Sequence, residues 1–143
     1  MPESAAQEAI IEDFSLMDEW EDKYAYIIEL GKNIPPLAEI HKNSSNIIKG
    51  CQSQVWMISR LEGNKVFFEA DSDAIIVKGL INLLIKAYSG LTPDEIINTE
   101  PYFIEKIGMQ QHLSMTRSNG LAAMMKQMKL HALAYKAKLE SGT

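Results

Sequence analysis

The sequence predicts an α+β fold in which a small antiparallel sheet of two or three strands packs against several helices. Three observations support this: two β-prone runs flank a glycine-containing turn, helical periodicity precedes and follows them, and one segment is apolar on nearly all sides. The runs are 55–58 and 65–70, the turn is 62–64, and the apolar segment is 74–88. With no internal repeat or linker, we expect one domain over residues 1–143.

The first helix that the sequence clearly predicts covers residues 17–30, where apolar side chains recur near a 3.6-residue period. Asp18 and Glu21 have the spacing of a capping pair at its start. A weaker helix is expected before it, over residues 3–14. The chain therefore begins with two helices.

An extended connection leads from these helices to the hairpin. The proline pair at 35–36 ends the helical region, and we expect extended chain through about residue 45. Residues 46–49 are a candidate third strand, because an isolated two-stranded ribbon is marginally stable in water.

Helices follow the hairpin. Residues 71–73 offer N-cap oxygens to a central buried helix at 74–88, and residues 92–95 form a capping box with proline at the first helical position. Short helices are expected through 103–107, and a last long helix at about 118–139. The side chains expected on the core side of that helix are Leu121, Met124, Met125, Met128 and Leu133.

The charge balance and the apolar pattern exclude two classes of partner. The chain has 14 lysines and arginines against 19 acidic residues, a formal net charge of −5, so it lacks the basic surplus of a nucleic-acid binder. The longest apolar stretch, 74–84, is too short to cross a bilayer, and the acidic amino terminus does not resemble a secretory signal. We expect a cytoplasmic protein that binds neither nucleic acid nor membrane.

Cys51 is the only cysteine of the chain. Gly50 precedes it and three polar residues follow, while the hydrophobic pattern stops at Ile48 and resumes at Val55. This placement predicts a thiol presented on a loop. A lone thiol cannot cycle through an internal disulfide, but its thiolate can attack the sulfur of another protein's persulfide.

Other roles for the cysteine are less well supported. The three histidines, His41, His112 and His131, show no metal spacing, so we expect no metal and no bound cofactor. Cys51, His112 and Asn119 match a cysteine hydrolase in composition only. An inert structural cysteine, and an adaptor protein that does not need its thiol, also remain as alternatives.

Arg117 is a further candidate site residue. It stands at the start of the last helix, where the positive end of the helix dipole opposes a cation. It could contact an anion or a partner near the thiol and lower the thiol pKa, or it could be a solvated side chain paired with a carboxylate. The sequence leaves both interpretations open.

Several separated motifs occur in one order along the chain and together identify a family. They are Trp-Glu-Asp-Lys-Tyr at 20–24, Ile-Ile-Glu-Leu-Gly at 27–31, Asn-Ile-Ile-Lys-Gly-Cys-Gln-Ser-Gln-Val-Trp at 46–56, Ala-Asp-Ser-Asp-Ala at 70–74, Ile-Val-Lys-Gly-Leu at 76–80, His-Leu-Ser at 112–114 and Arg-Ser-Asn-Gly-Leu at 117–121. Such a set is more specific than any single motif. Through it the chain resembles the SufE family, sulfur acceptors that work with a cysteine desulfurase in iron–sulfur cluster assembly.

This resemblance implies a fold and a function. The fold would be similar to that of the iron–sulfur scaffold proteins (SufE/NifU-like). Cys51 would take persulfide sulfur from a PLP-dependent cysteine desulfurase, stimulate that enzyme, and pass the sulfur to a downstream iron–sulfur scaffold complex. The residues expected to support the cysteine loop or the partner interface are Arg117, Gly50, Gln52, Ser53, Asp73 and His112. A homodimer is left open.

Overall fold

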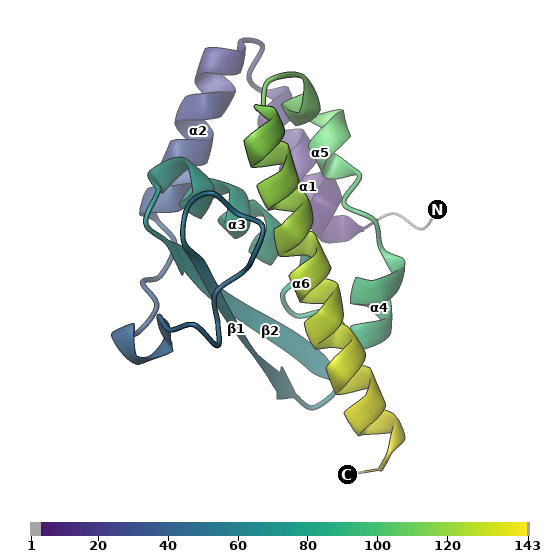
Figure 1. Ribbon diagram of the computed structural model, residues 1–143. Helices are drawn as coiled ribbons and strands as arrows, with labels where there is room; N and C mark the ends of the chain where they lie inside the picture. The colour runs from purple at the N-terminus through teal and green to yellow at the C-terminus, as the bar shows by residue number, and fades with distance from the viewer. Residues whose placement is uncertain (1–3, 143) are drawn as a thin grey trace.

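The computed structural model describes residues 4–142 and has an α+β fold, which confirms the predicted fold class. Figure 1 shows the elements in place. They are α1 (Ala5–Ser15), α2 (Trp20–Lys32), the 3-10 turn η1 (Glu39–His41), β1 (Val55–Glu62), β2 (Lys65–Ser72), α3 (Ile75–Tyr88), α4 (Pro93–Asn98), α5 (Phe103–Lys106), the 3-10 turn η2 (Met109–Gln111) and α6 (Met115–Glu140).

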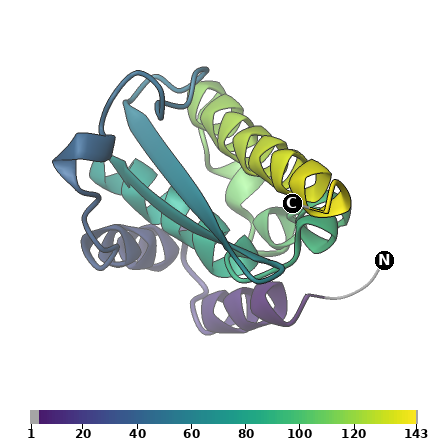
Figure 2. The same ribbon diagram turned by 90° about the horizontal axis from the view of Figure 1, so that it is seen from below.

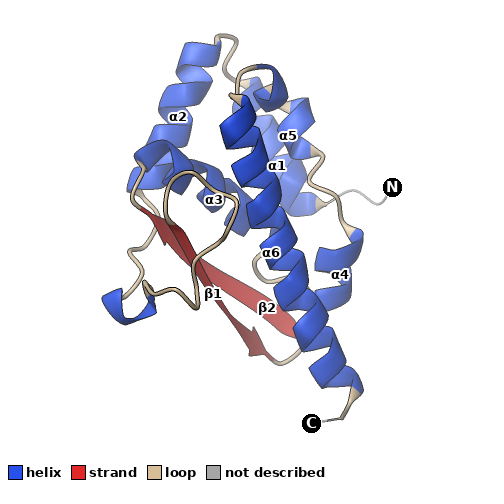
Figure 3. Ribbon diagram, viewed as in Figure 1, coloured by secondary structure: helices blue, strands red, loops and turns tan. Residues whose placement is uncertain are grey.

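The described sheet is the predicted hairpin of β1 and β2, drawn in red in Figure 3. Val55 pairs with Ser72 at one end and Glu62 with Lys65 at the other, where Gly63 turns the chain with a φ of 63°. Alternate residues on one face are buried, as expected for a sheet covered by helices on one side. The apolar residues of this face are Val55, Met57, Val66, Phe68 and Ala70.

The predicted third strand is wrong. Residues 46–49 contribute one isolated bridge, Ile47 opposite Trp56, flanked by hydrogen bonds from Ile48 N to Val55 O (2.7 Å) and from Met57 N to Asn46 O (2.9 Å). The chain then leaves the sheet at Gly50, whose φ of 93° is unsuited to a strand. The expected extended connection is also interrupted, because η1 lies within it.

Helix α3 is central, as its all-round apolar pattern predicted. It contacts α1, α2, α6 and β2, and α1 and α6 lie on different sides of the molecule (Figure 2). The contact with α2 is very close: a Cβ atom at Gly79 would overlap the carbonyl oxygen of Ile27, and one at Gly31 would lie 2.5 Å from Ile75 O. These two glycines let the helix backbones approach each other.

The helix boundaries confirm some sequence predictions and correct others. Thr92 and Glu95 form the predicted capping box of α4, whereas Asp18 and Glu21 do not cap α2, whose N-cap is Glu19 without a side-chain hydrogen bond. Helix α1 matches the weaker predicted helix, although residue 3 of that prediction lies outside the described residues. No helix within residues 4–142 has both the length and the apolar character that crossing a membrane requires.

Helix α6 begins earlier than predicted. It starts at Met115, because Ser114 is its N-cap and accepts a hydrogen bond from Arg117 N (3.2 Å). Its methionines at 124, 125 and 128 are core residues, as predicted, but Leu133 is 49% exposed and was wrongly placed among them.

Candidate functional site

The cysteine lies on the loop that connects the Ile47 bridge to β1, and this loop arches toward α6 (Figures 1 and 3). The Cys51 thiol donates a weak hydrogen bond to the carbonyl oxygen of Gly120, with Sγ and O 3.6 Å apart. A Cβ at Gly120 would lie 3.6 Å from Sγ and 4.0 Å from the Cys51 Cα, which is ordinary van der Waals contact. The loop therefore rests directly on α6.

The role of Gly120 was missed at the sequence level. A signal was present, because a glycine inside a long helix costs about 1 kcal/mol relative to alanine and needs a packing or functional reason. The sequence does not reveal that a loop almost seventy residues away lies against this position.

A small cavity of about 110 Å³ lies beside the thiol, between the loop, the start of α3 and the start of α6. Three predicted site residues, Gln52, Ser53 and Arg117, lie on its wall together with Cys51. The other lining residues are Ala74, Ile76, Val77, Leu80, Thr116, Gly120 and Met124. The expectation of a freely presented thiol is thus wrong in part, because Cys51 lies on a loop but is partly buried against apolar side chains.

Burial raises the pKa of the Cys51 thiol above its ordinary value of 9.0. In this docked position the thiol is therefore protonated at neutral pH, which agrees with its donation to the Gly120 carbonyl. Arg117 is exposed, lines the cavity and, among residues 4–142, forms no ion pair with a carboxylate. Arg117 therefore does not lower the pKa of the Cys51 thiol while the loop rests on α6.

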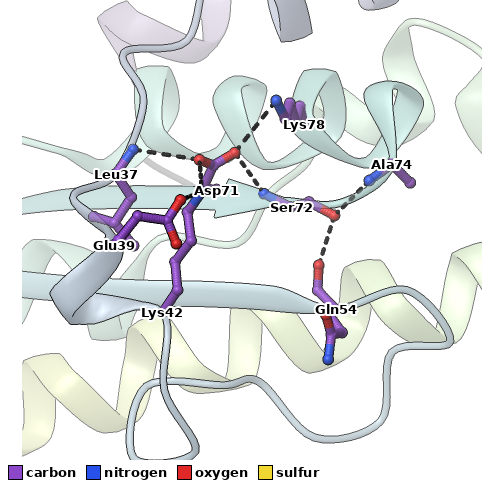
Figure 4. Close-up of polar contacts among 8 residues, drawn as sticks. All are labelled: Leu37, Glu39, Lys42, Gln54, Asp71, Ser72, Ala74 and Lys78. Carbon is purple, nitrogen blue, oxygen red and sulfur yellow. Dashed lines mark hydrogen bonds and ion pairs between the residues drawn. The ribbon is translucent and has the colours of Figure 1, made fainter.

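The carboxyl-terminal end of the loop is fixed through Gln54 (Figure 4). Gln54 N donates to Asp73 Oδ1 (3.0 Å), and Gln54 O accepts from Ser72 Oγ (2.7 Å) and from Asp73 N (3.3 Å). Ser72 Oγ in turn accepts from Ala74 N (3.2 Å). The prediction that residues 71–73 cap α3 directly is therefore wrong: α3 begins without a side-chain N-cap, and these oxygens hold the loop to the β2–α3 junction.

The buried carboxylate of Asp71 reinforces this junction (Figure 4). It accepts from Leu37 N (3.3 Å) and Ser72 N (2.8 Å), and it forms ion pairs with Lys42 (3.1 Å) and Lys78 (3.5 Å). Burial alone would raise the pKa of Asp71, but these hydrogen bonds and cations lower it below its ordinary value. Asp71 thus joins the segment after α2, the end of β2 and the start of α3.

His112 and Asn119 do not assemble a hydrolase site with the thiol. The His112 ring is exposed and stacks on Trp20, with ring centroids 4.3 Å apart and planes 8° from parallel. Neither His112 nor Asn119 lines the cavity beside Cys51. The hydrolase alternative therefore lacks its base in this structure. In residues 4–142, no three or more histidine, cysteine or acidic side chains are grouped to hold a metal.

The fold and the site define a class: small α+β domains that hold one cysteine on a loop, partly sheltered against a helix. The chain belongs to the SufE family, described as "Fe-S metabolism associated domain", which matches residues 8–132. This membership supports a role in iron–sulfur metabolism.

Similar proteins are known from both sequence and structure. An uncharacterized SufE-like protein of Rhizobium meliloti is 43% identical over 128 residues, covering 86% of this chain and 91% of its own length. Another from Rhizobium etli is 43% identical over 133 residues, covering 90% of each chain. The solution structure of a hypothetical protein from Thermus thermophilus has the same fold, with a TM-score of 0.76 at 20% identity over 92% of this chain and 96% of that one.

Proposed function

We propose that this protein is a sulfur acceptor that takes persulfide sulfur from a PLP-dependent cysteine desulfurase onto Cys51. It stimulates the desulfurase by removing its product and passes the sulfur to a downstream iron–sulfur scaffold complex. The observation that carries the proposal is the placement of the only cysteine at a loop that rests on α6 beside a small cavity. Family membership supports the same assignment.

The transfer is a thiol–disulfide type of exchange. The Cys51 thiolate attacks the outer sulfur of the partner's persulfide, forming a new S–S bond as the old one breaks, and the partner cysteine leaves as a thiolate. Cys51 gains one sulfur as a persulfide, and no external oxidant or reductant is needed. The pyridoxal phosphate chemistry belongs to the desulfurase.

The docked loop is a resting state in this proposal. Its thiol is protonated because burial raises the pKa, so attack requires the loop to leave α6 and the thiol to enter a wetter environment. Gly50, with its positive φ next to Cys51, gives the loop a flexible point on one side, while the Gln54 hydrogen bonds hold the other side. After transfer, the redocked loop would place the outer sulfur at this small cavity, partly sheltered from reductants.

Replacing Cys51 by serine separates sulfur acceptance from the adaptor alternative. We expect wild type to raise the rate of sulfide release by a cysteine desulfurase, and Cys51→Ser to give no rise above the desulfurase alone, while its circular dichroism and melting temperature stay close to wild type. An adaptor that does not need the thiol would give the same stimulation with both proteins, and that result would contradict the proposal.

Replacing Gly120 by leucine tests the resting contact. The new side chain would occupy the place of the thiol, because even a Cβ at this position is 3.6 Å from Sγ. We expect the loop to be displaced, the thiol pKa to fall towards its ordinary value, and alkylation of Cys51 by iodoacetamide at pH 7 to become faster than in wild type. Ala122→Leu, at an exposed position of the same helix, is the matched control. An equal alkylation rate in both variants would show that Gly120 does not control the thiol.

A further inference from the structure

A second group of reactive side chains lies between the hairpin and the carboxyl-terminal half of α6. Ser59 of β1 lies opposite His131 and Tyr135, which are one turn apart on α6. Ser59 Oγ is 2.6 Å from His131 Nδ1 and 3.0 Å from the Tyr135 hydroxyl. None of these residues lines the cavity beside Cys51. The group is therefore separate from the sulfur site.

Two proton assignments satisfy the contacts of this group, one with the proton on His131 Nδ1 and one with it on Nε2, and only the second makes His131 a base for Ser59. Burial lowers the pKa of His131 below its ordinary value of 6.5, so the ring is neutral at pH 7 and one ring nitrogen is unprotonated. With Nδ1 unprotonated, Ser59 donates to it, and Tyr135 donates to Ser59 Oγ. Nε2 then carries the proton. The Gln127 amide nitrogen is placed 3.4 Å from Nε2, so the amide accepts from Nε2–H once it is flipped to turn its oxygen to the ring.

This arrangement has the components of an activated nucleophile. A hydroxyl lies within hydrogen-bond distance of a neutral imidazole, and a third group orients the imidazole from its other nitrogen. Gln127 is the positioning residue here, since it contacts the ring and not the cavity.

The group opens onto a cavity of about 580 Å³, large enough for a small organic molecule. Its walls are neutral and partly apolar, and no described lining residue carries a carboxylate or an ammonium group. The lining residues are His41, Asn46, Ile58, Ser59, Leu130, His131, Ala134 and Tyr135. His41 is the other titratable imidazole at this cavity, and the Phe68 ring lies 6.2 Å from that of His131. Such walls suit an uncharged substrate with a short apolar chain.

We propose that Ser59, with His131 as its base, gives the protein a second, serine-based activity toward small uncharged carboxylic esters. Ser59 Oγ bonds to the carbonyl carbon as its proton passes to His131. The ester C–O bond then breaks, and the alcohol leaves with the proton from His131. Water, deprotonated by His131, next attacks the acyl-serine and releases the carboxylic acid and free Ser59. No oxidant, reductant or metal takes part.

Phosphonylation by an alkyl fluorophosphonate tests this proposal in the Cys51→Ser background, where no thiol can react. Ser59 Oγ would bond to phosphorus, fluoride would leave, and His131 would take the proton. We expect one adduct, located on Ser59 by peptide mass spectrometry, and none in the same protein with Ser59→Ala. Replacing His131 by glutamine should slow labelling by roughly 100-fold, the lower end of what a positioned base contributes. Gln127→Leu should slow it less.

The pH profile distinguishes catalysis from a purely structural hydrogen bond. Labelling of Ser59 should rise with pH as His131 loses its proton, with a midpoint below 6.5, and this rise should vanish in His131→Gln. Melting temperatures of all variants show whether each one is folded. The proposal is overturned if folded Cys51→Ser protein takes up no label on Ser59, or if labelling is as fast with His131→Gln as without it.

Discussion

Replacing Gly79 by alanine is expected to lower the free energy of unfolding by about 3 kcal/mol and the melting temperature by about 10 °C. The added Cβ would overlap the carbonyl oxygen of Ile27, which is backbone and cannot rotate away. Helices α2 and α3 would have to separate, and the packing of the central helix would loosen. The higher helix propensity of alanine offsets only about 1 kcal/mol of this loss.

A matched glycine in another helix provides the control for this prediction. At Gly120 a new Cβ would meet no atom closer than 3.6 Å, so Gly120→Ala should leave the free energy of unfolding unchanged or slightly higher. Urea unfolding of both variants measures the difference. Equal stability of Gly79→Ala and Gly120→Ala would contradict the close crossing of α2 and α3.

Replacing Asp71 by asparagine is expected to lower the free energy of unfolding by about 3 kcal/mol. The change keeps the shape of the side chain but removes the charge that pairs with Lys42 and Lys78, and it turns an amide NH₂ toward groups that donate hydrogen bonds. Glu39→Gln is the control, because Glu39 also pairs with Lys42 but its side chain is 88% exposed. The Glu39–Lys42 pair should contribute less than about 1 kcal/mol to the free energy of unfolding, so Glu39→Gln should destabilise the protein less than Asp71→Asn does.

The contribution of Asp71 to the free energy of unfolding should decrease as the pH falls. Its pKa is lower in the folded than in the unfolded protein, so its contribution is fully present above the unfolded value of about 3.8 and is lost as the pH falls through the folded value. The difference in unfolding free energy between wild type and Asp71→Asn should therefore narrow as the pH falls below about 4. A difference that stays constant from pH 7 to pH 3 would show that the carboxylate charge is not the cause.

The sequence predicted those elements whose signals are local. The central helix α3 follows from its apolar pattern, the hairpin from two β-prone runs around Gly63, and the start of α4 from the Thr92–Glu95 capping box. Each depends on residues close together in the chain. Some wrong predictions concern groups whose partners lie elsewhere in the chain: the oxygens of Ser72 and Asp73 bind Gln54 and do not cap α3. Others misjudged local signals: Asp18 and Glu21 do not cap α2, and the Ser114 N-cap starts α6 earlier than predicted.

At the candidate site, features that depend on neighbouring residues could be predicted, and features that depend on distant residues could not. The loop position of Cys51 could be predicted because the flanking polar residues are its neighbours in sequence. The partial burial of the thiol could not, because it depends on Gly120 of α6 and on the side chains of α3. Likewise, the stacking of His112 on Trp20 joins residues more than ninety positions apart, and no spacing in the sequence indicates it.

The central claim is that Cys51 accepts sulfur, and the intact mass of the protein after incubation with a cysteine desulfurase and free cysteine tests it most directly. We predict that wild type gains the mass of one sulfur atom, that dithiothreitol removes the gain, and that Cys51→Ser gains nothing. Omitting the desulfurase should also abolish the gain. Unchanged wild-type mass with each of several desulfurases, under conditions where those enzymes release sulfide, would contradict the claim.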